Sequence, residues 1–356
     1  MTRTYIVCWV SSLYFLEVKL MARILKSKRD INFYIENFME ACMLKGLSKK
    51  TMKSYESSLV LFSKYMEDEY NLNNIKEIKK QHTEDYIQFS LDRGKYSYVG
   101  NDKTISINNP TARGDFGKTV SGVTINNYIR NLKVFFNWCV DNKIIKSSPM
   151  DSIQFIKTKR KPKDDITDLE FNTLLKAMDL TKYSDYRDYV IVQLIMDTGM
   201  RLGETLALTI DDIDIERKTI LIPGDISKSK KDRYVFFSNK MAIILRKWLQ
   251  YKDRYSKNEL LIFPTLRGTP LHVRNFEANF RVYKDRAGIS KNISPHCLRN
   301  NFAKRCLMSG MDIYTLSRIL GHSSVTVTEK AYLDLSVNDI KKNYQKFSPL
   351  ENMKHL

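Results

Sequence analysis

The chain has 356 residues, 43% of them apolar, which is enough for two domains of ordinary size that each bury a core. Lysine and arginine number 59 against 40 aspartate and glutamate residues, so the formal net charge is +19. This balance favours a polyanionic partner over a neutral small molecule, with nucleic acid first and an anionic membrane surface second.

The five cysteines are scattered and include no CxxC pair, so neither a zinc site nor a disulfide framework is predicted. A reducing cytoplasm fits this pattern. Residues 5–16 resemble a targeting segment, but they are too short to span a bilayer and lack a small-residue cleavage site. We therefore expect a cytoplasmic protein with no membrane partner, and the sequence leaves both Met1 and Met21 open as the translation start.

The N-terminal half is predicted to be a small helical bundle. The first helix is expected over 31–44, the second to open at Ser48, the third to be capped by Thr83, and the fourth to begin near Ser121. Apolar residues recur at helical spacing in the first, second and fourth, which predicts a shared core.

Two irregular segments interrupt the helical pattern. Residues 94–122 are rich in Gly, Asn and Thr and are predicted to be an inserted loop, with an alternation at 103–107 that indicates a short hairpin or no regular structure. Residues 157–165, "KTKRKPKDD", contain a proline and precede the capping box Thr167–Glu170, so they are predicted to link two domains. A linker this basic can also follow a phosphate backbone.

Past the linker, the pattern predicts helices together with three short strands. Helices at 167–179 and 186–198 lead to strands at 212–216, 219–223 and 233–237, the last two joined by the lysine-rich turn "SKSKKD". Ser238 is expected to cap a further helix, and others are expected near 273–287, 295–309, 313–320 and 326–334. Because the strands are local and antiparallel, the fold class is predicted to be α+β and mostly helical.

The stretch "TGMRLGE" places Arg201 at the start of a helix, with Glu204 one turn later to orient it. Amide N–H groups at a helix start favour an anion, and a guanidinium there adds paired hydrogen bonds to phosphate oxygens. Taken alone, the motif is more often a structural Arg–Glu pair.

Two further motifs carry histidines. "SPHCLRNN" puts His296 and Arg299 three residues apart on the opening turns of a helix, so that both point the same way. His322 follows Leu320 and Gly321 at a helix end, and Tyr332 lies ten residues on. Taken singly, these residues have ordinary interpretations: a solvated face, a packing histidine, and one of 20 tyrosines.

In combination and in this order, the motifs resemble those of the tyrosine recombinases, the phage integrase family. The shared pattern is an arginine in TGxRxxE, a lysine in a hairpin turn, HxxR, and LGHSS followed by a tyrosine. "GLSKKTMKSYESSLVLFSKYM" and "TVSGVTINNYIRNLKVFFNWCVDNKIIKSSPM" are similar to the family's helical core-binding domain, so the resemblance covers about residues 30 to 335. The histidine-to-tyrosine spacing is ten where many members have nine, although ten also occurs.

The resemblance implies a nucleophile and a set of residues around the scissile phosphate. By matching motif positions, the catalytic set is Arg201, Lys228, His296, Arg299, His322 and Tyr332. Lys230 and Lys231 remain alternatives to Lys228 in the same turn.

The resemblance also implies the chemistry, which uses no metal, ATP or other cofactor. Tyr332 attacks the phosphate to form a 3′-phosphotyrosyl link, while Arg201 and Arg299 clamp the oxygens. Lys228 protonates the leaving 5′ oxygen, and His296 acts as acid or base at the tyrosine. His322 is expected to hydrogen-bond the phosphate.

Basic residues elsewhere are expected to hold the DNA: Lys49, Lys50, Lys53, Arg130, Lys133, Lys159 and Arg160. The three lysines at 49–53 crowd the first turn of the second helix, where cations oppose the helix dipole unless they meet anions. The partners implied are double-stranded DNA with specific recombination sites, a homotetramer on paired sites, and an accessory DNA-bending or directionality factor.

The expected domain organisation follows from these motifs. Residues 30–156 form a helical core-binding, SAM-like domain with the insertion at 94–122, and residues 167–340 form the catalytic domain. Residues 1–29 are an N-terminal extension, 157–166 a basic linker, and 341–356 a C-terminal tail whose packing on a neighbouring protomer is left open.

The preferred function is a site-specific recombinase that integrates or excises a mobile element. An Xer-like resolvase is an alternative, but the insertion and the length exceed the compact resolvase pattern. A type IB topoisomerase would use nearly the same residues, and the core-binding resemblance argues against it. A non-catalytic helical DNA-binding regulator would explain the charge yet would need none of the six aligned residues.

Overall fold

The computed structural model describes residues 29–100, 109–158, 164–227, 230–256, 260–322 and 324–332. The chain divides into two compact units, Met1–Arg160 and Lys161–Leu356, and each is described by itself. The first is helical, and the second combines helices with one three-stranded antiparallel sheet. This architecture confirms the predicted fold class, α+β and mostly helical.

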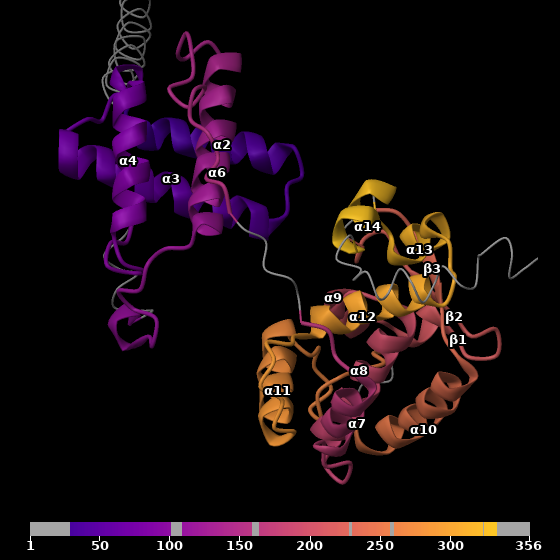
Figure 1. Ribbon diagram of the computed structural model, residues 1–356. Helices are drawn as coiled ribbons and strands as arrows, with labels where there is room; N and C mark the ends of the chain where they lie inside the picture. The colour runs from indigo at the N-terminus through magenta and orange to yellow at the C-terminus, as the bar shows by residue number, and fades with distance from the viewer. Residues whose placement is uncertain are drawn as a thin grey trace, which may run out of the picture. The chain divides into compact units, whose positions relative to one another are not determined.

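In the described part of the N-terminal unit, four helices pack against one another around a shared core (Figure 1). Their bounds are α2 (Ile31–Leu44), α3 (Lys49–Tyr70), α4 (Lys80–Asp92) and α6 (Gly122–Asp141). A short 3₁₀ turn, η1 (Ile75–Glu77), lies between α3 and α4. Aromatic rings meet edge to face at the centre, where Phe62 lies 5.8 Å from Phe136 between ring centroids.

Serine side chains begin two of these helices as predicted. Ser48 accepts a hydrogen bond from the amide of Thr51, and Ser121 accepts one from the amide of Thr124. The third expectation was wrong, because α4 begins at Lys80 and Thr83 lies inside it. The Thr83 hydroxyl donates to the carbonyl oxygens of Lys80 and Pro149, so the side chain ties the helix to a distant segment and does not cap it.

The backbone near the two ends of the predicted insertion is joined by a β-bridge. Gly94 and Thr119 form an isolated antiparallel bridge, and a 3₁₀ turn, η2 (Pro110–Ala112), lies between them. The alternation predicted at 103–107 lies outside the described residues. The bridge brings the two ends of the loop together at the start of α6.

The C-terminal unit contains the sheet and the remaining helices. The helices are α7 (Asp168–Lys176), α8 (Tyr183–Thr198), α9 (Leu202–Ala207), α10 (Asn239–Tyr255), α11 (Val273–Arg286), α12 (Pro295–Met308), α13 (Ile313–Leu320) and α14 (Val325–Tyr332). Thr167 and Ser238 cap α7 and α10 as predicted. Helix α8 begins three residues earlier than expected, because the turn at Tyr183 is itself buried against the core.

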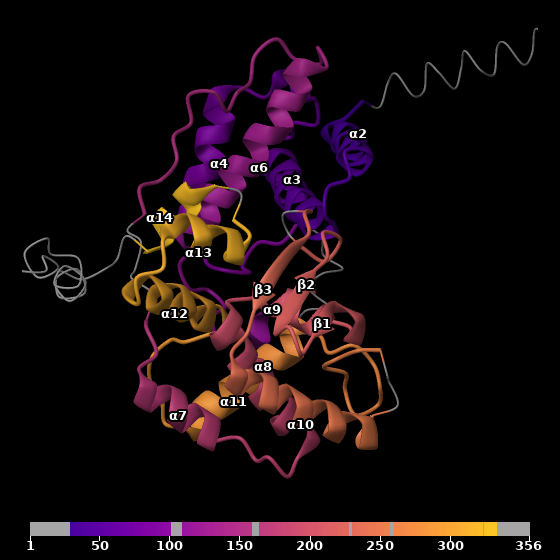
Figure 2. The same cartoon turned by 90° about the vertical axis from the view of Figure 1, so that its right-hand side faces the viewer.

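The strands β1 (Ile213–Asp214), β2 (Thr219–Ile222) and β3 (Arg233–Phe236) lie side by side in chain order, as Figure 2 shows. Ile220 pairs with Val235, and both are buried. The first strand is shorter than the predicted 212–216, because Asp212 accepts hydrogen bonds from Thr209 and closes a 3₁₀ turn, η3 (Ile210–Asp212), before it. Helix α13 packs against β3.

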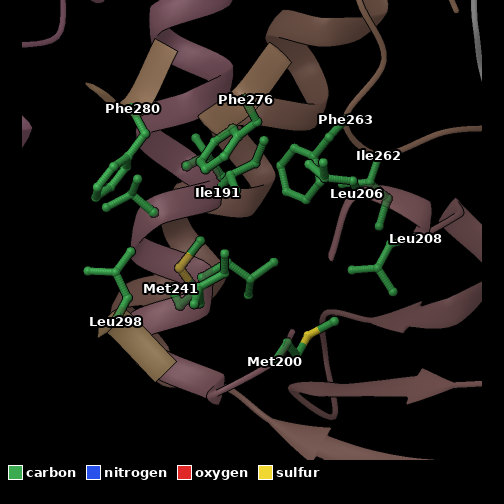
Figure 3. Close-up of a cluster of buried hydrophobic side chains, with 14 of the residues drawn as sticks. Ile191, Met200, Leu206, Leu208, Met241, Ile262, Phe263, Phe276, Phe280 and Leu298 are labelled. Carbon is green, nitrogen blue, oxygen red and sulfur yellow. The ribbon is translucent and has the colours of Figure 1, made fainter. Parts of the chain in front are cut away.

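Helix α8 lies at the centre of this unit and is buried along most of its length. Figure 3 shows Ile191 of this helix beside Phe276 of α11, in a cluster that also contains Phe280 of α11 and Leu298 of α12. The buried charges Arg187 and Asp188 of α8 pair with each other at 2.8 Å, and α8 is enclosed by α10 and α12. The surrounding helices therefore hold the C-terminal end of α8 in place. Within the described ranges, no helix has the length and apolarity needed to cross a membrane.

Candidate active site

Thr198 and Gly199 end α8 in a tight turn. The Thr198 hydroxyl donates to the Leu194 carbonyl at 2.7 Å and accepts from the amide of Met200 at 3.3 Å. Gly199 has a φ of +67°, and a Cβ there would lie 2.3 Å from a ring carbon of Phe302. Glycine is thus required both by the left-handed backbone and by the close approach. This turn places Arg201 directly before α9, as its N-cap residue.

Glu204 joins two arginines. One carboxylate oxygen accepts from Arg201 Nη1 at 2.7 Å and from Arg233 Nη1 at 3.1 Å, and the other accepts from Arg233 Nη2 at 2.5 Å. Glu204 is 2% exposed. Burial raises the pKa of this carboxyl, but the hydrogen bonds from Arg233 and Arg201 outweigh it and hold the pKa below its usual range. The predicted role of Glu204 in orienting Arg201 is confirmed by this contact.

Three arginines bind successive carbonyl oxygens at the end of α13. Arg233 Nε donates to Ile319 at 3.2 Å, Arg299 Nη2 to Leu320 at 2.7 Å, and Arg201 Nη2 to Gly321 at 3.2 Å. The last carbonyls of a helix have no partner within it and carry the negative end of its dipole. Guanidinium groups from α9, β3 and α12 therefore satisfy and neutralise this helix end.

Arg299 is 3% exposed, and both of its terminal nitrogens make hydrogen bonds. Nη1 donates to the Gly199 carbonyl at 2.6 Å, which ties α12 to the end of α8. Nη2 lies 3.1 Å from His322 Nε2. A buried guanidinium with oxygen and nitrogen acceptors around it is fixed in position and remains charged.

His322 joins this cluster to the last described helix. Its Nδ1 lies 2.7 Å from the hydroxyl of Thr328 in α14, and its amide donates to the Ser317 carbonyl. Burial, followed by the charges of Arg299, Arg201 and Arg233 and by His296, lowers the pKa of His322 to about 4. The imidazole is therefore neutral at pH 7.

Of the remaining predicted site residues, the structure describes His296 and the backbone at Tyr332, but not Lys228. His296 is exposed on the first turn of α12, three residues before Arg299, and near enough to His322 to lower its pKa. Tyr332 is the last residue of α14, which packs on α12 and α13. Lys228 lies outside the described residues, whereas Lys230 and Lys231 are exposed in the turn between β2 and β3.

The sequence analysis missed Arg233 and Thr328. A signal for Arg233 existed, because strand alternation puts it in phase with Val235 and Phe237 on the inner face, where a charged residue needs a partner. Thr328 gave no comparable signal, since a hydroxyl in a short helix is common.

The two helices that carry predicted DNA-binding residues in the N-terminal unit, α3 and α6, are in contact. Lys49, Lys50 and Lys53 are exposed on the first turn of α3, and Arg130 and Lys133 lie on α6. The buried amide of Asn131 donates to the carbonyl and hydroxyl oxygens of Ser54, so the residues after Lys53 and Arg130 touch. Lys159 and Arg160 lie outside the described residues.

A Gly321→Ala variant should be destabilised by about 2 to 4 kcal/mol, enough to lower the Tm by several degrees. Gly321 has a φ of +63°, and a Cβ there would lie 2.7 Å from Arg233 Cδ, whose guanidinium is held by Glu204. Gly203→Ala is the matched control, because its Cβ would meet nothing within 4 Å. Equal Tm values for both variants in thermal unfolding would contradict both the backbone strain and the close contact with Arg233.

Family models match both units of the chain. The phage integrase family matches residues 165–339, and the phage integrase N-terminal SAM-like domain matches residues 35–107. The chain therefore belongs to the phage integrase family, the tyrosine recombinases, whose members are site-specific recombination enzymes.

Similar proteins include two curated recombinases and two solved structures. Tyrosine recombinase XerD of Staphylococcus haemolyticus is 26% identical over 326 residues, covering 88% of this chain and 98% of its own. Tyrosine recombinase XerC of Chlamydia pneumoniae is 29% identical over 228 residues, covering 64% of this chain and 72% of its own.

Both structures share the fold. The Tn1549 transposon integrase in complex with transposon right end DNA has a TM-score of 0.67 at 17% identity, with 88% of this chain and 99% of that chain covered. The XerH site-specific recombinase bound to palindromic difH substrate has a TM-score of 0.63 at 19% identity, with 89% and 84% covered.

Proposed function

We propose that this enzyme cleaves and rejoins DNA strands through a 3′-phosphotyrosyl intermediate formed on Tyr332. The observation that carries the proposal is the convergence of Arg201, Arg299 and His322 at the end of α13, beside the helix that ends at Tyr332. Fixed cations in a partly buried site stabilise charge that develops on phosphate oxygens in the transition state.

In the proposed step, the tyrosine oxygen forms a bond to phosphorus and the bond from phosphorus to the 5′ oxygen breaks. Lys228 supplies the proton that the 5′ oxygen takes up, and His296 removes or returns the proton of the tyrosine. The phosphotyrosyl link conserves the bond energy, so the 5′-hydroxyl of another strand can reverse the reaction. No ATP or metal is required by this scheme.

DNA would lie along the basic residues of the N-terminal unit. The adjoining groups on α3 and α6 offer cations to the phosphate backbone, and the linker residues Lys159 and Arg160 are proposed to follow it. We further propose a homotetramer on paired sites, assisted by an accessory DNA-bending or directionality factor, acting in the cytoplasm.

Integration or excision of a mobile element is the proposed role, because the insertion at 94–122 enlarges the first domain. Resolution of chromosome dimers is the second candidate, and the similarity to XerC and XerD over much of the chain favours it. Sequencing the DNA that flanks the gene distinguishes them, since a mobile element leaves repeated ends and a circular junction.

Purified protein mixed with supercoiled plasmids tests the activity. Plasmids that carry the flanking DNA should yield covalent protein–DNA adducts and strand exchange, and plasmids without it should stay supercoiled. Relaxation of the plasmid that lacks any site would instead indicate a type IB topoisomerase. Binding without any adduct would indicate a DNA-binding regulator.

A Lys228→Ala variant should cleave normal DNA very slowly but regain most of its rate on a substrate with a 5′-bridging phosphorothiolate. The sulfur departs as a stable thiolate and needs no proton, so the substrate separates acid catalysis from general electrostatic help. Lys230→Ala and Lys231→Ala, from the exposed part of the same turn, are the controls and should be only mildly affected. If the phosphorothiolate substrate instead restored cleavage by Lys230→Ala or Lys231→Ala, that lysine would be the acid.

A further inference from the structure

The contacts of His322 fix the position of its proton. A guanidinium has N–H donors and no acceptor, so Arg299 Nη2, at 3.1 Å, must donate to His322 Nε2. A neutral imidazole carries one proton, and it therefore lies on Nδ1. Nδ1 then donates to the Thr328 hydroxyl oxygen at 2.7 Å.

This tautomer cannot hydrogen-bond a phosphate. The proposed role of His322 toward the scissile phosphate requires a proton on Nε2, because phosphodiester oxygens only accept hydrogen bonds. If the imidazole stays neutral, Nδ1 must then become an acceptor, and its partner must change from acceptor to donor. Protonating the ring is the other route, and the lowered pKa of about 4 opposes it.

Thr328 has the chemistry that the neutral route needs. A hydroxyl has one donor hydrogen and two acceptor lone pairs, and it reverses its role by rotating about one bond. Thr328 is fully buried, so no bulk water reaches it to replace the hydrogen bond. It also lies one helical turn before Tyr332 on α14.

We propose that Thr328 is a positioning residue whose hydroxyl reverses its hydrogen bond to His322 when DNA binds. This inference rests on the proposed function. In the free enzyme, neutral His322 accepts a hydrogen bond at Nε2 from Arg299 Nη2. In the DNA complex, Nδ1 releases its proton to solvent and Nε2 takes one up, so that neutral His322 donates from Nε2 to the scissile phosphate while Thr328 donates to Nδ1. Arg299 Nη2 then turns its hydrogen bond from Nε2 to the same phosphate. No net proton is taken up, and the same contact aligns α14 with the phosphate.

Paired substitutions separate the hydroxyl from the shape of the side chain. Thr328→Ser keeps a hydroxyl and should cleave within about threefold of wild type. Thr328→Val keeps the shape without the hydroxyl, so either tautomer leaves a buried nitrogen unsatisfied, and single-turnover cleavage should fall about 10- to 100-fold. DNA binding should change little. Thr326→Val, two residues earlier on the exposed side of α14, is the matched control.

The tautomer itself is measured by ¹⁵N NMR of histidine-labelled protein, with the His322 signals assigned from a His322→Gln spectrum. The Tyr332→Phe variant is compared free and bound to the duplex on which wild type forms its adduct. We expect the proton on Nδ1 in the free protein and on Nε2 in the complex.

Several outcomes overturn the proposal. A proton that stays on Nδ1 in the complex, a doubly protonated ring, full activity of Thr328→Val, or an equal loss in Thr328→Ser each removes the role of the hydroxyl. Failure of the proposed function would appear separately, as the absence of any adduct with wild-type protein.

Discussion

A Tyr332→Phe variant is expected to form no covalent DNA adduct while binding its DNA site about as tightly as wild type. Phenylalanine lacks the oxygen that would bond to phosphorus, and the basic residues expected to bind DNA lie elsewhere in the chain. Adduct formation is measured on a denaturing gel with a nicked substrate that traps the cleaved strand, and binding is measured by mobility shift.

Tyr314→Phe is the control for this experiment. Tyr314 is a tyrosine of the neighbouring helix α13 and is 70% exposed, so its loss should leave adduct formation unchanged. An adduct that persists in the Tyr332 variant would place the nucleophile on another tyrosine.

An Arg201→Ala variant is expected to cleave at least about 10²-fold more slowly than wild type, with little change in DNA binding. The guanidinium matters most when charge develops on the phosphate, whereas binding is spread over many other cations. The fold should tolerate the change, because Glu204 keeps its two hydrogen bonds to Arg233. Single-turnover cleavage well below the Tm measures the effect.

Arg299→Ala should lose cleavage to a similar degree and should also lower the Tm. The buried carbonyls of Gly199 and Leu320 would lose their donor, which is costly in a site that water does not reach. Arg246→Ala, which removes an exposed ion pair between Arg246 of α10 and Glu216, is the control for the loss of an arginine. If Arg201→Ala cleaves at nearly the wild-type rate, the role of that arginine is structural.

Local sequence rules predicted the elements that local interactions determine. The bounds of α13 match the prediction at 313–320, because Asp312 caps its first turn and Gly321 ends it in a left-handed conformation. Thr83 shows the limit of such rules. Its hydroxyl has a distant partner, Pro149, and no local pattern distinguishes a capping threonine from one that joins two segments.

In the site, too, the sequence predicted the local motifs but not their distant partners. Motif spacing brought Arg201, Arg299 and His322 together as candidates, and their contacts now join them at one helix end. The partners that fix these side chains come from far along the chain: Arg233 bonds Glu204 across 29 residues, and Arg299 bonds Gly199 across 100. Such pairs depend on how the helices pack, which neither periodicity nor spacing reveals.

The contacts of three arginines with the end of α13 limit which residues can replace them in natural variants of this enzyme. Arg233 alone contacts both oxygens of Glu204, the Ser227 hydroxyl and the Ile319 carbonyl, and it uses three nitrogens to do so. A lysine has the same charge but only three N–H donors on a single nitrogen, so it could not make all four of these hydrogen bonds. Natural variants should therefore keep arginine at this position, and lysine should not replace it.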